Sequence, residues 1–91
     1  MIHERFIKVI NAKLPRKGAF TQLEQLTGIN ARSWGHAYNG RTQPGVEHLE
    51  QLCRLFPEYT RWLMTGQTRP EMGDTSPDLE QLEALKKTLG S

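Results

Sequence analysis

Apolar residues recur at intervals of three and four positions along most of the chain, and this spacing predicts amphipathic helices. A first helix is expected over about residues 3–14, because Pro15 and Gly18 follow it and end it. A second, shorter helix is expected over about residues 19–27. The apolar positions of these two helices are Ile2, Phe6, Val9, Ile10 and Leu14 in the first and Phe20, Leu23 and Leu26 in the second.

A glycine separates the second helix from a third. Gly28 can adopt the left-handed backbone that turns a chain sharply at the end of a helix. Asn30 is a favourable N-cap for a helix that reaches to about Asn39. Trp34 and Ala37, three positions apart, are expected on its buried side. The polar residues at the start of this helix should therefore face outward.

Three more helices complete the pattern. One is expected over about residues 46–56, after the polar loop GRTQPG, and it ends at Pro57. A short helix follows over about residues 57–65, and the last helix has Ser76 as its N-cap with Pro77 in its first turn. The apolar positions of these helices are Val46, Leu49, Leu52, Cys53 and Phe56, then Tyr59, Trp62 and Leu63, and finally Leu79, Leu82, Leu85 and Leu89.

The chain shows no strand-like alternation, so the predicted fold class is all-α. We expect a compact five-helix domain over residues 1–65, a linker over residues 66–77 and a C-terminal amphipathic helix over residues 78–91. A helix of about 13 residues is marginal alone in water, so its leucine stripe must pack against something. We expect homodimerisation through Leu79, Leu82, Leu85 and Leu89, with folding back onto the same domain as the alternative.

Charge is unevenly distributed, although the net charge is only +2. Residues 1–45 hold seven Lys and Arg against two acids, whereas residues 71–91 hold five acids against two lysines. A basic first half suits a protein that meets a polyanion, and a solvated charged surface is the simpler alternative.

Several classes of protein are not expected. The chain has one cysteine, so no internal disulfide is predicted, and no secretory signal or apolar span of roughly 18–20 residues is recognisable. A cytoplasmic protein is therefore expected. The three histidines, His3, His36 and His48, lack metal-ligand spacing, and no catalytic constellation or glycine-rich phosphate loop is recognisable. We therefore expect no metal, no cofactor and no enzymatic activity.

The positions from Phe20 to Ala37 resemble the helix-turn-helix of the phage repressor and Cro family, which is lambda-repressor-like and XRE-type. Counting from Phe20, the matching places are Leu23 at the fourth, Gly28 at the ninth, Ile29 at the tenth, Trp34 at the fifteenth and Ala37 at the eighteenth. The segments NGRTQP and VEHLEQLCRLF resemble the family's closing loop and following helix, so the resemblance covers about residues 4–64. Glu24 stands where the family usually has a small residue, and Trp34 where it has Ile or Val. The resemblance therefore requires Glu24 to point outward.

This resemblance implies that the third helix enters the major groove of double-stranded DNA. The candidate base-reading residues are Asn30, Ala31, Arg32, Ser33 and His36. Arg32 is favoured among them, because a guanidinium can make two hydrogen bonds to one guanine. The candidate phosphate-binding residues, at the start of the second helix and in the loop after the third, are Lys17, Ala19, Phe20, Asn39, Arg41, Thr42 and Gln43.

The resemblance and the short length together predict a sequence-specific transcriptional regulator. The simplest form is a bacterial or prophage repressor that binds a pseudo-palindromic operator as a homodimer. Two alternatives stay open: an antitoxin that binds a toxin and its own promoter, and an adaptor of the same fold that binds protein through the C-terminal helix.

Overall fold

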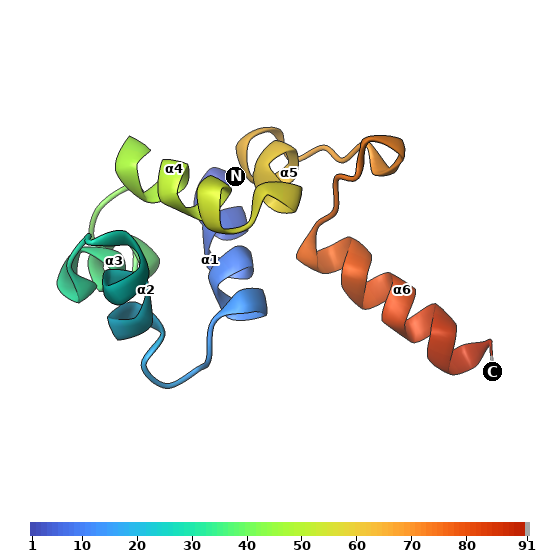
Figure 1. Ribbon diagram of the computed structural model, residues 1–91, viewed down its shortest axis with the longest axis horizontal. Helices are drawn as coiled ribbons and strands as arrows, with labels where there is room; N and C mark the ends of the chain where they lie inside the picture. The colour runs from blue at the N-terminus through green and yellow to red at the C-terminus, as the bar shows by residue number, and fades with distance from the viewer. Residues whose placement is uncertain (91) are drawn as a thin grey trace.

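Every regular element in the computed structural model, which describes residues 1–90, is a helix, so the all-α class is confirmed for these residues. Helix α1 lies between the α2–α3 pair and α5, α4 lies over α3, and α6 extends away from them (Figure 1). Two short 3-10 helices add to the six predicted helices. The elements are α1 (Ile2–Lys13), α2 (Ala19–Thr27), α3 (Ala31–Tyr38), α4 (Val46–Leu55), η1 (Pro57–Tyr59), α5 (Thr60–Thr65), η2 (Pro70–Met72) and α6 (Pro77–Leu89).

The core forms around α1, whose buried face is Phe6, Val9 and Ile10. Two polar side chains at the start of α1 also form hydrogen bonds with carbonyl groups near the C-terminal ends of α3 and α5. The His3 Nε2 atom donates to the carbonyl of Ala37 at 2.9 Å, and the Arg5 Nε atom donates to the carbonyl of Leu63 at 2.9 Å. Since such carbonyls lack partners within their own helix, these bonds fix the ends of α3 and α5 against α1. The other buried apolar residues are Leu14, Leu23, Trp34, Ala37, Leu52, Tyr59, Trp62 and Leu63.

Two expectations about the apolar faces are wrong. Leu26, expected beside Phe20 and Leu23, is 52% exposed, and Val46, expected on the inner face of the fourth helix, is 79% exposed. His48 is buried at the start of α4 in place of Val46. The buried side of α4 is therefore rotated from the one that hydrophobic spacing predicts.

The segment predicted as a linker is folded against the domain at several points. The Asp74 carboxylate accepts from the Arg61 Nε atom at 2.6 Å and from the backbone N–H of Arg69 at 3.0 Å. Ser76 is buried and caps α6, because its hydroxyl oxygen accepts from the N–H of Leu79 at 3.0 Å. The direction of α6 is thus set by contacts before and within its first turn.

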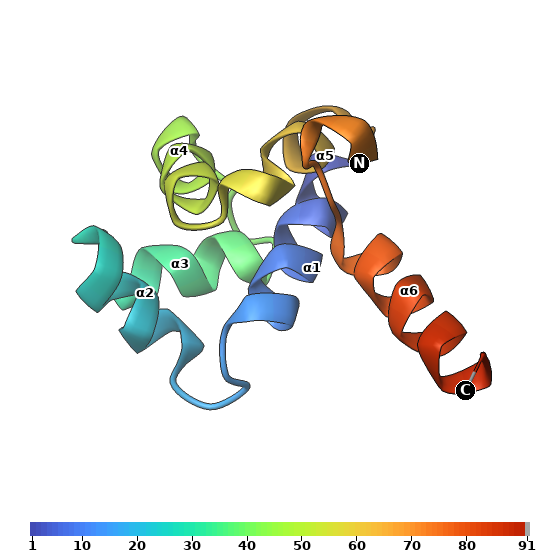
Figure 2. The same ribbon diagram turned by 45° about the vertical axis from the view of Figure 1, so that its right-hand side comes forward.

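Most of α6 does not fold back onto the domain. Leu79 is half-buried, whereas Leu82, Leu85 and Leu89 are 47%, 54% and 84% exposed. The second view shows the same arrangement, with the C-terminal end of α6 pointing away from the other helices (Figure 2). The folding-back alternative thus holds for the first turn alone within the described chain.

Candidate nucleic-acid interface

The turn between α2 and α3 is closed by local hydrogen bonds. Gly28 adopts φ 79°, and its N–H donates to the carbonyl of Glu24 at 2.8 Å. The Thr27 hydroxyl donates to the carbonyl of Leu23 at 2.6 Å and accepts from the N–H of Ile29 at 3.2 Å. The same oxygen accepts from the indole Nε1 of Trp34 at 3.3 Å. One threonine, which the sequence analysis did not single out, therefore joins α2, the turn and α3.

The start of α3 is capped by two side chains. The Asn30 Oδ1 atom accepts from the N–H of Ser33 at 2.7 Å, as expected of an N-cap. The Glu24 carboxylate points outward from α2 and accepts from the N–H of Ala31 at 2.8 Å. A negative group is favourable at this positive end of a helix. Glu24 therefore couples α2 to α3 instead of keeping them apart.

The inner side of α3 is held by an aromatic cluster. Trp34 is fully buried, stacks on Phe6 at 6.1 Å between ring centroids, and meets His48 edge-on at 4.8 Å. The N–H of Gly45 donates to His48 Nδ1 at 3.0 Å, so the ring proton must lie on Nε2, which donates to the Ser33 hydroxyl at 2.8 Å. Burial lowers the pKa of His48, which keeps the ring neutral. A buried histidine thus connects the start of α4 to α3.

The outer side of α3 holds the candidate base-reading residues. Arg32 is exposed, and Ala31 and His36 are half-exposed. Among the described residues, the guanidinium of Arg32 and the imidazole of His36 make no hydrogen bond or ion pair. Asn30 and Ser33 differ from them, since one oxygen of Asn30 caps α3 and the Ser33 hydroxyl is turned toward His48. The face that is free to meet a ligand is therefore centred on Arg32.

A groove of about 720 Å³ lies beside α3, between the end of α1 and the start of α2. It brings together Ala19, Phe20 and Asn39, three of the candidate phosphate-binding residues, with Arg16, which the sequence analysis did not select. Gly18 is the N-cap of α2 and supplies no side chain, so the first N–H groups of α2 lack a side-chain cap. Such groups and the helix dipole favour an anion.

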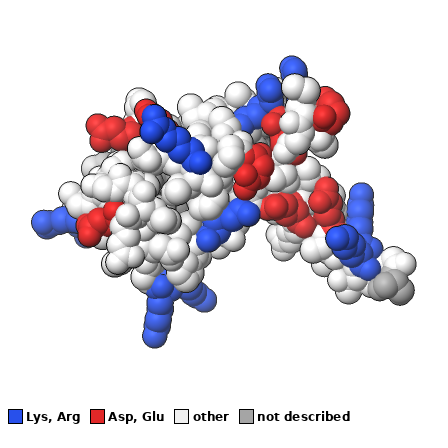
Figure 3. Space-filling view, in the orientation of Figure 1, with Lys and Arg blue, Asp and Glu red and all other residues white. Residues whose placement is uncertain are grey.

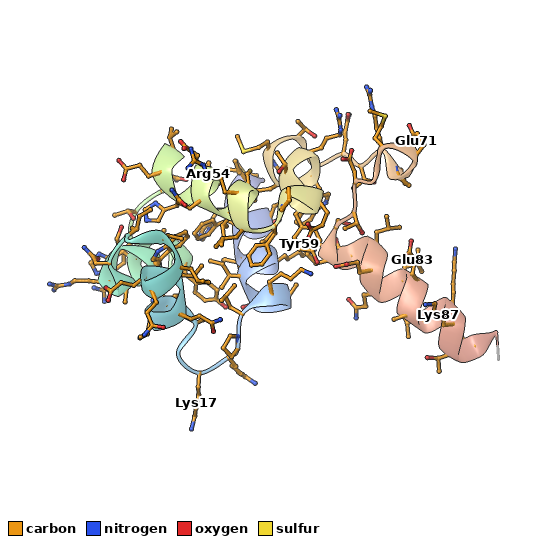
Figure 4. All side chains as sticks on the ribbon, viewed as in Figure 1. Lys17, Arg54, Tyr59, Glu71, Glu83 and Lys87 are labelled. Carbon is orange, nitrogen blue, oxygen red and sulfur yellow. The ribbon has the colours of Figure 1, made fainter. Side chains whose placement is uncertain are left out.

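The remaining phosphate candidates flank this groove and the end of α3. Lys17 is exposed and points away from the body of the molecule (Figure 4). Arg41, Thr42 and Gln43 are also exposed, but the N–H groups of Arg41 and Thr42 donate to the carbonyl of His36 at 2.9 and 3.4 Å. In this loop the side chains, not the backbone amides of those two residues, are available to an anion.

Charge is unevenly distributed over the molecule. Lys and Arg side chains project from the end that carries α2, α3 and the loop before α2, whereas acidic side chains gather where α6 begins (Figure 3). Residues 1–45 carry a net charge of +5 and residues 71–91 a net charge of −3. The exposed face of α3 and the groove beside it therefore share the basic end.

No helix within residues 1–90 combines the length and apolar character needed to cross a membrane. The same residues contain no group of three or more His, Cys, Asp or Glu side chains placed to hold a metal ion.

Comparison with known proteins gives one informative similarity. The chain is 33% identical over 60 residues to Repressor protein C of Escherichia phage P2, and these residues are 64% of this chain. The match spans 61% of the length of that relative. No family model matches the sequence.

Proposed function

We propose that this chain is a cytoplasmic transcriptional repressor that places the outer side of α3 in the major groove of operator DNA. The observation that carries the proposal is the hydrogen-bonded α2–turn–α3 unit, which leaves the Arg32 side chain exposed and without a partner within the described chain. The similarity to a phage repressor protein supports the same function. In this account the protein acts by occupying DNA and not by catalysis.

The proposed contacts divide into two kinds. Arg32, with Ala31 and His36 beside it, would read base edges, because a guanidinium can bond both O6 and N7 of guanine. The groove at the start of α2, together with Lys17 and Arg41, would hold phosphates and set the register of α3 on the duplex. Asn30 and Ser33 retain a role as base readers through the atoms that their internal hydrogen bonds leave free.

We further propose that the repressor acts as a homodimer. One small domain of this type contacts few base pairs, and a two-fold dimer doubles the contact with half-sites one helical turn apart. The exposed leucines of α6 supply apolar surface for such an assembly. Residues 1–65 would then form the DNA-binding domain and α6 the dimerisation element.

The two kinds of contact are separable by substitution. Arg32→Ala should relax preference at one base position, with a loss of about 1–3 kcal/mol on the preferred duplex and a smaller loss on unrelated duplexes. Arg41→Ala should weaken binding to all duplexes alike and reduce the salt slope by about one. Fluorescence anisotropy on preferred and scrambled duplexes at several salt concentrations measures both effects.

A matched control comes from the opposite end of the molecule. Arg69 is exposed in the segment before η2, so Arg69→Ala removes the same charge without touching the proposed DNA face. Equal losses of DNA affinity for Arg69→Ala and Arg41→Ala would show that Arg41 acts through net charge and not through a phosphate contact. Equal losses of Arg32→Ala on every duplex would refute base reading by Arg32. Indifference of the unaltered protein to DNA at low salt would favour the adaptor alternative.

A further inference from the structure

Two apolar surfaces of this chain are exposed and do not meet each other. The first, here named the α6 stripe, consists of Leu82, Leu85 and Leu89. The second, here named the α4–α5 groove, has a volume of about 220 Å³ and presents apolar atoms at its surface. Its lining residues are Val46, Leu49, Glu50, Cys53 and Met64, of which Val46 is 79% and Met64 47% exposed.

The α6 stripe is kept away from the groove of its own chain by the contacts at the start of α6. The buried hydroxyl of Tyr59 donates to the Glu80 carboxylate, and burial raises the pKa of Tyr59, which keeps its proton in place. Lys8 pairs with Asp78 at 3.0 Å, and the N–H of Thr75 donates to the carbonyl of Glu58 at 2.9 Å. These bonds aim α6 outward, and Tyr59 and Glu83 mark its direction in Figure 4.

A dimer held only by two α6 stripes packed on each other should be weak. Helix α6 has 13 residues, and a helix of this length is marginal alone in water, so two such stripes order each other only weakly. A preformed groove on a folded domain removes this difficulty, because one of the two surfaces is already ordered. The α4–α5 groove is such a surface.

We propose that the α6 stripe of one copy docks in the α4–α5 groove of a second copy, and that the exchange is reciprocal. The three leucines follow the three-then-four spacing of a helix face that fits a groove. Charge agrees with this pairing, because Lys86 flanks the stripe in the last turn of α6 while Glu47 lies in the first turn of α4, beside the groove. The other carboxylate at the groove, that of Glu50, is already paired with Arg54 at 2.8 Å. A reciprocal exchange closes as a two-fold dimer. The inference specifies the dimer contact and rests on the homodimer of the proposed function.

Cys53 makes the proposal directly testable, because it is the one cysteine of the chain and lines the groove. Leu85→Cys places a second thiol on the α6 stripe. Mild oxidation of the DNA-free variant should then give a covalent species of twice 10.4 kDa, in which peptide mapping joins position 85 to Cys53. Lys87→Cys is the matched control, since it lies two positions later and about 200° around the same helix. It should give little cross-linked product.

Adding Cys53→Ser shows which surface the α6 stripe meets: the groove of a second copy, the α6 stripe of a second copy, or its own chain. Loss of the cross-link in the double variant Leu85→Cys with Cys53→Ser supports docking in the groove. Persistence of the cross-link there would show that α6 pairs with its own copy, and a disulfide within one chain would show folding back. Either result overturns the proposal, as does a species that stays monomeric and uncross-linked.

A second measurement does not depend on thiols. Val46→Asp changes an exposed side chain of the groove and should raise the dimer dissociation constant at least about tenfold in sedimentation experiments. Met72→Asp, at a residue 67% exposed outside both surfaces, should leave it unchanged. An equal effect of both variants would contradict the docking site. Since all these measurements are made without DNA, failure of DNA binding and failure of the dimer contact are observed separately.

Discussion

Replacement of His48 tests how the recognition helix is held, because this side chain contacts three parts of the structure. Its Nδ1 atom accepts the N–H of Gly45, its Nε2–H donates to Ser33, and its ring meets Trp34 at 4.8 Å. The side chain is 8% exposed, so water cannot readily replace these partners. His48→Ala should therefore loosen both α3 and the start of α4.

The expected cost follows from these contacts. Loss of an acceptor at a helix start costs about 0.5–2 kcal/mol. A hydroxyl left without its partner costs about 1 kcal/mol, and loss of an aromatic pair about 0.5–1.5 kcal/mol. Together they predict a decrease of about 2–4 kcal/mol in the free energy of unfolding of His48→Ala. This is a large fraction of the roughly 5–15 kcal/mol that stabilises a typical domain.

The cost should also depend on pH, with a definite sign. Burial lowers the pKa of His48 in the folded protein, so as the pH falls the unfolded chain binds the proton first, near the ordinary value of about 6.5. The stabilisation due to neutral His48 is complete above that pH and decreases below it. The difference in unfolding free energy between the unaltered protein and His48→Ala should therefore be smaller at about pH 5.5 than at about pH 7.5.

Urea unfolding followed by tryptophan fluorescence measures both quantities, since Trp34 lies against His48. His36→Ala is the matched control, because His36 is half-exposed on the outer side of α3 and should change stability by less than about 0.5 kcal/mol. A cost of His48→Ala below about 1 kcal/mol, or one that grows as the pH falls, would refute the assigned role.

Two further substitutions test the turn that positions α3. Glu24→Ala removes the acceptor of the Ala31 N–H and should lower the free energy of unfolding by about 1 kcal/mol. Glu24→Gln keeps an acceptor and should lower it less. Equal stability of the unaltered protein and both variants in urea unfolding would contradict the capping role. At Gly28, where φ is 79°, an added methyl group would meet no other atom within 4 Å. Gly28→Ala should therefore lower the free energy of unfolding by about 1–2 kcal/mol through its backbone conformation alone. Gly28→Asn should lower it less, because asparagine tolerates the left-handed conformation better. An unchanged thermal midpoint for Gly28→Ala would contradict this reasoning.

Helix boundaries were predictable from the sequence, because caps depend on residues a few positions apart. Gly28 adopts the expected left-handed conformation, Asn30 caps α3 and Ser76 caps α6. The order of helices follows directly from these boundaries and from hydrophobic spacing. The all-α class needed no tertiary information.

Burial at the start of α4 was not predictable in the same way. Hydrophobic spacing selects Val46, but the position facing Trp34 must also accept the N–H of Gly45, which an imidazole does and an aliphatic side chain does not. His48 is therefore buried and Val46 exposed. A clue was present in the sequence, since His48 is the third residue of its helix, where a side chain can reach back to the N-cap.

The candidate site was predictable in outline but not in its internal hydrogen bonds. Exposure of Arg32 and Arg41 follows from their place on the helix and in the loop. The turn of Ser33 toward His48 depends on a residue 15 positions away, which spacing within α3 does not report. Whether these residues read DNA stays a prediction.

Sequence-specific DNA recognition is the central claim, and selection of bound duplexes from a random library at about 0.15 M salt tests it most directly. The account predicts enrichment of a pseudo-palindrome with half-sites about 10 base pairs apart, one position of which loses its preference in Arg32→Ala. Recovery of sequences no different from the starting library would contradict it.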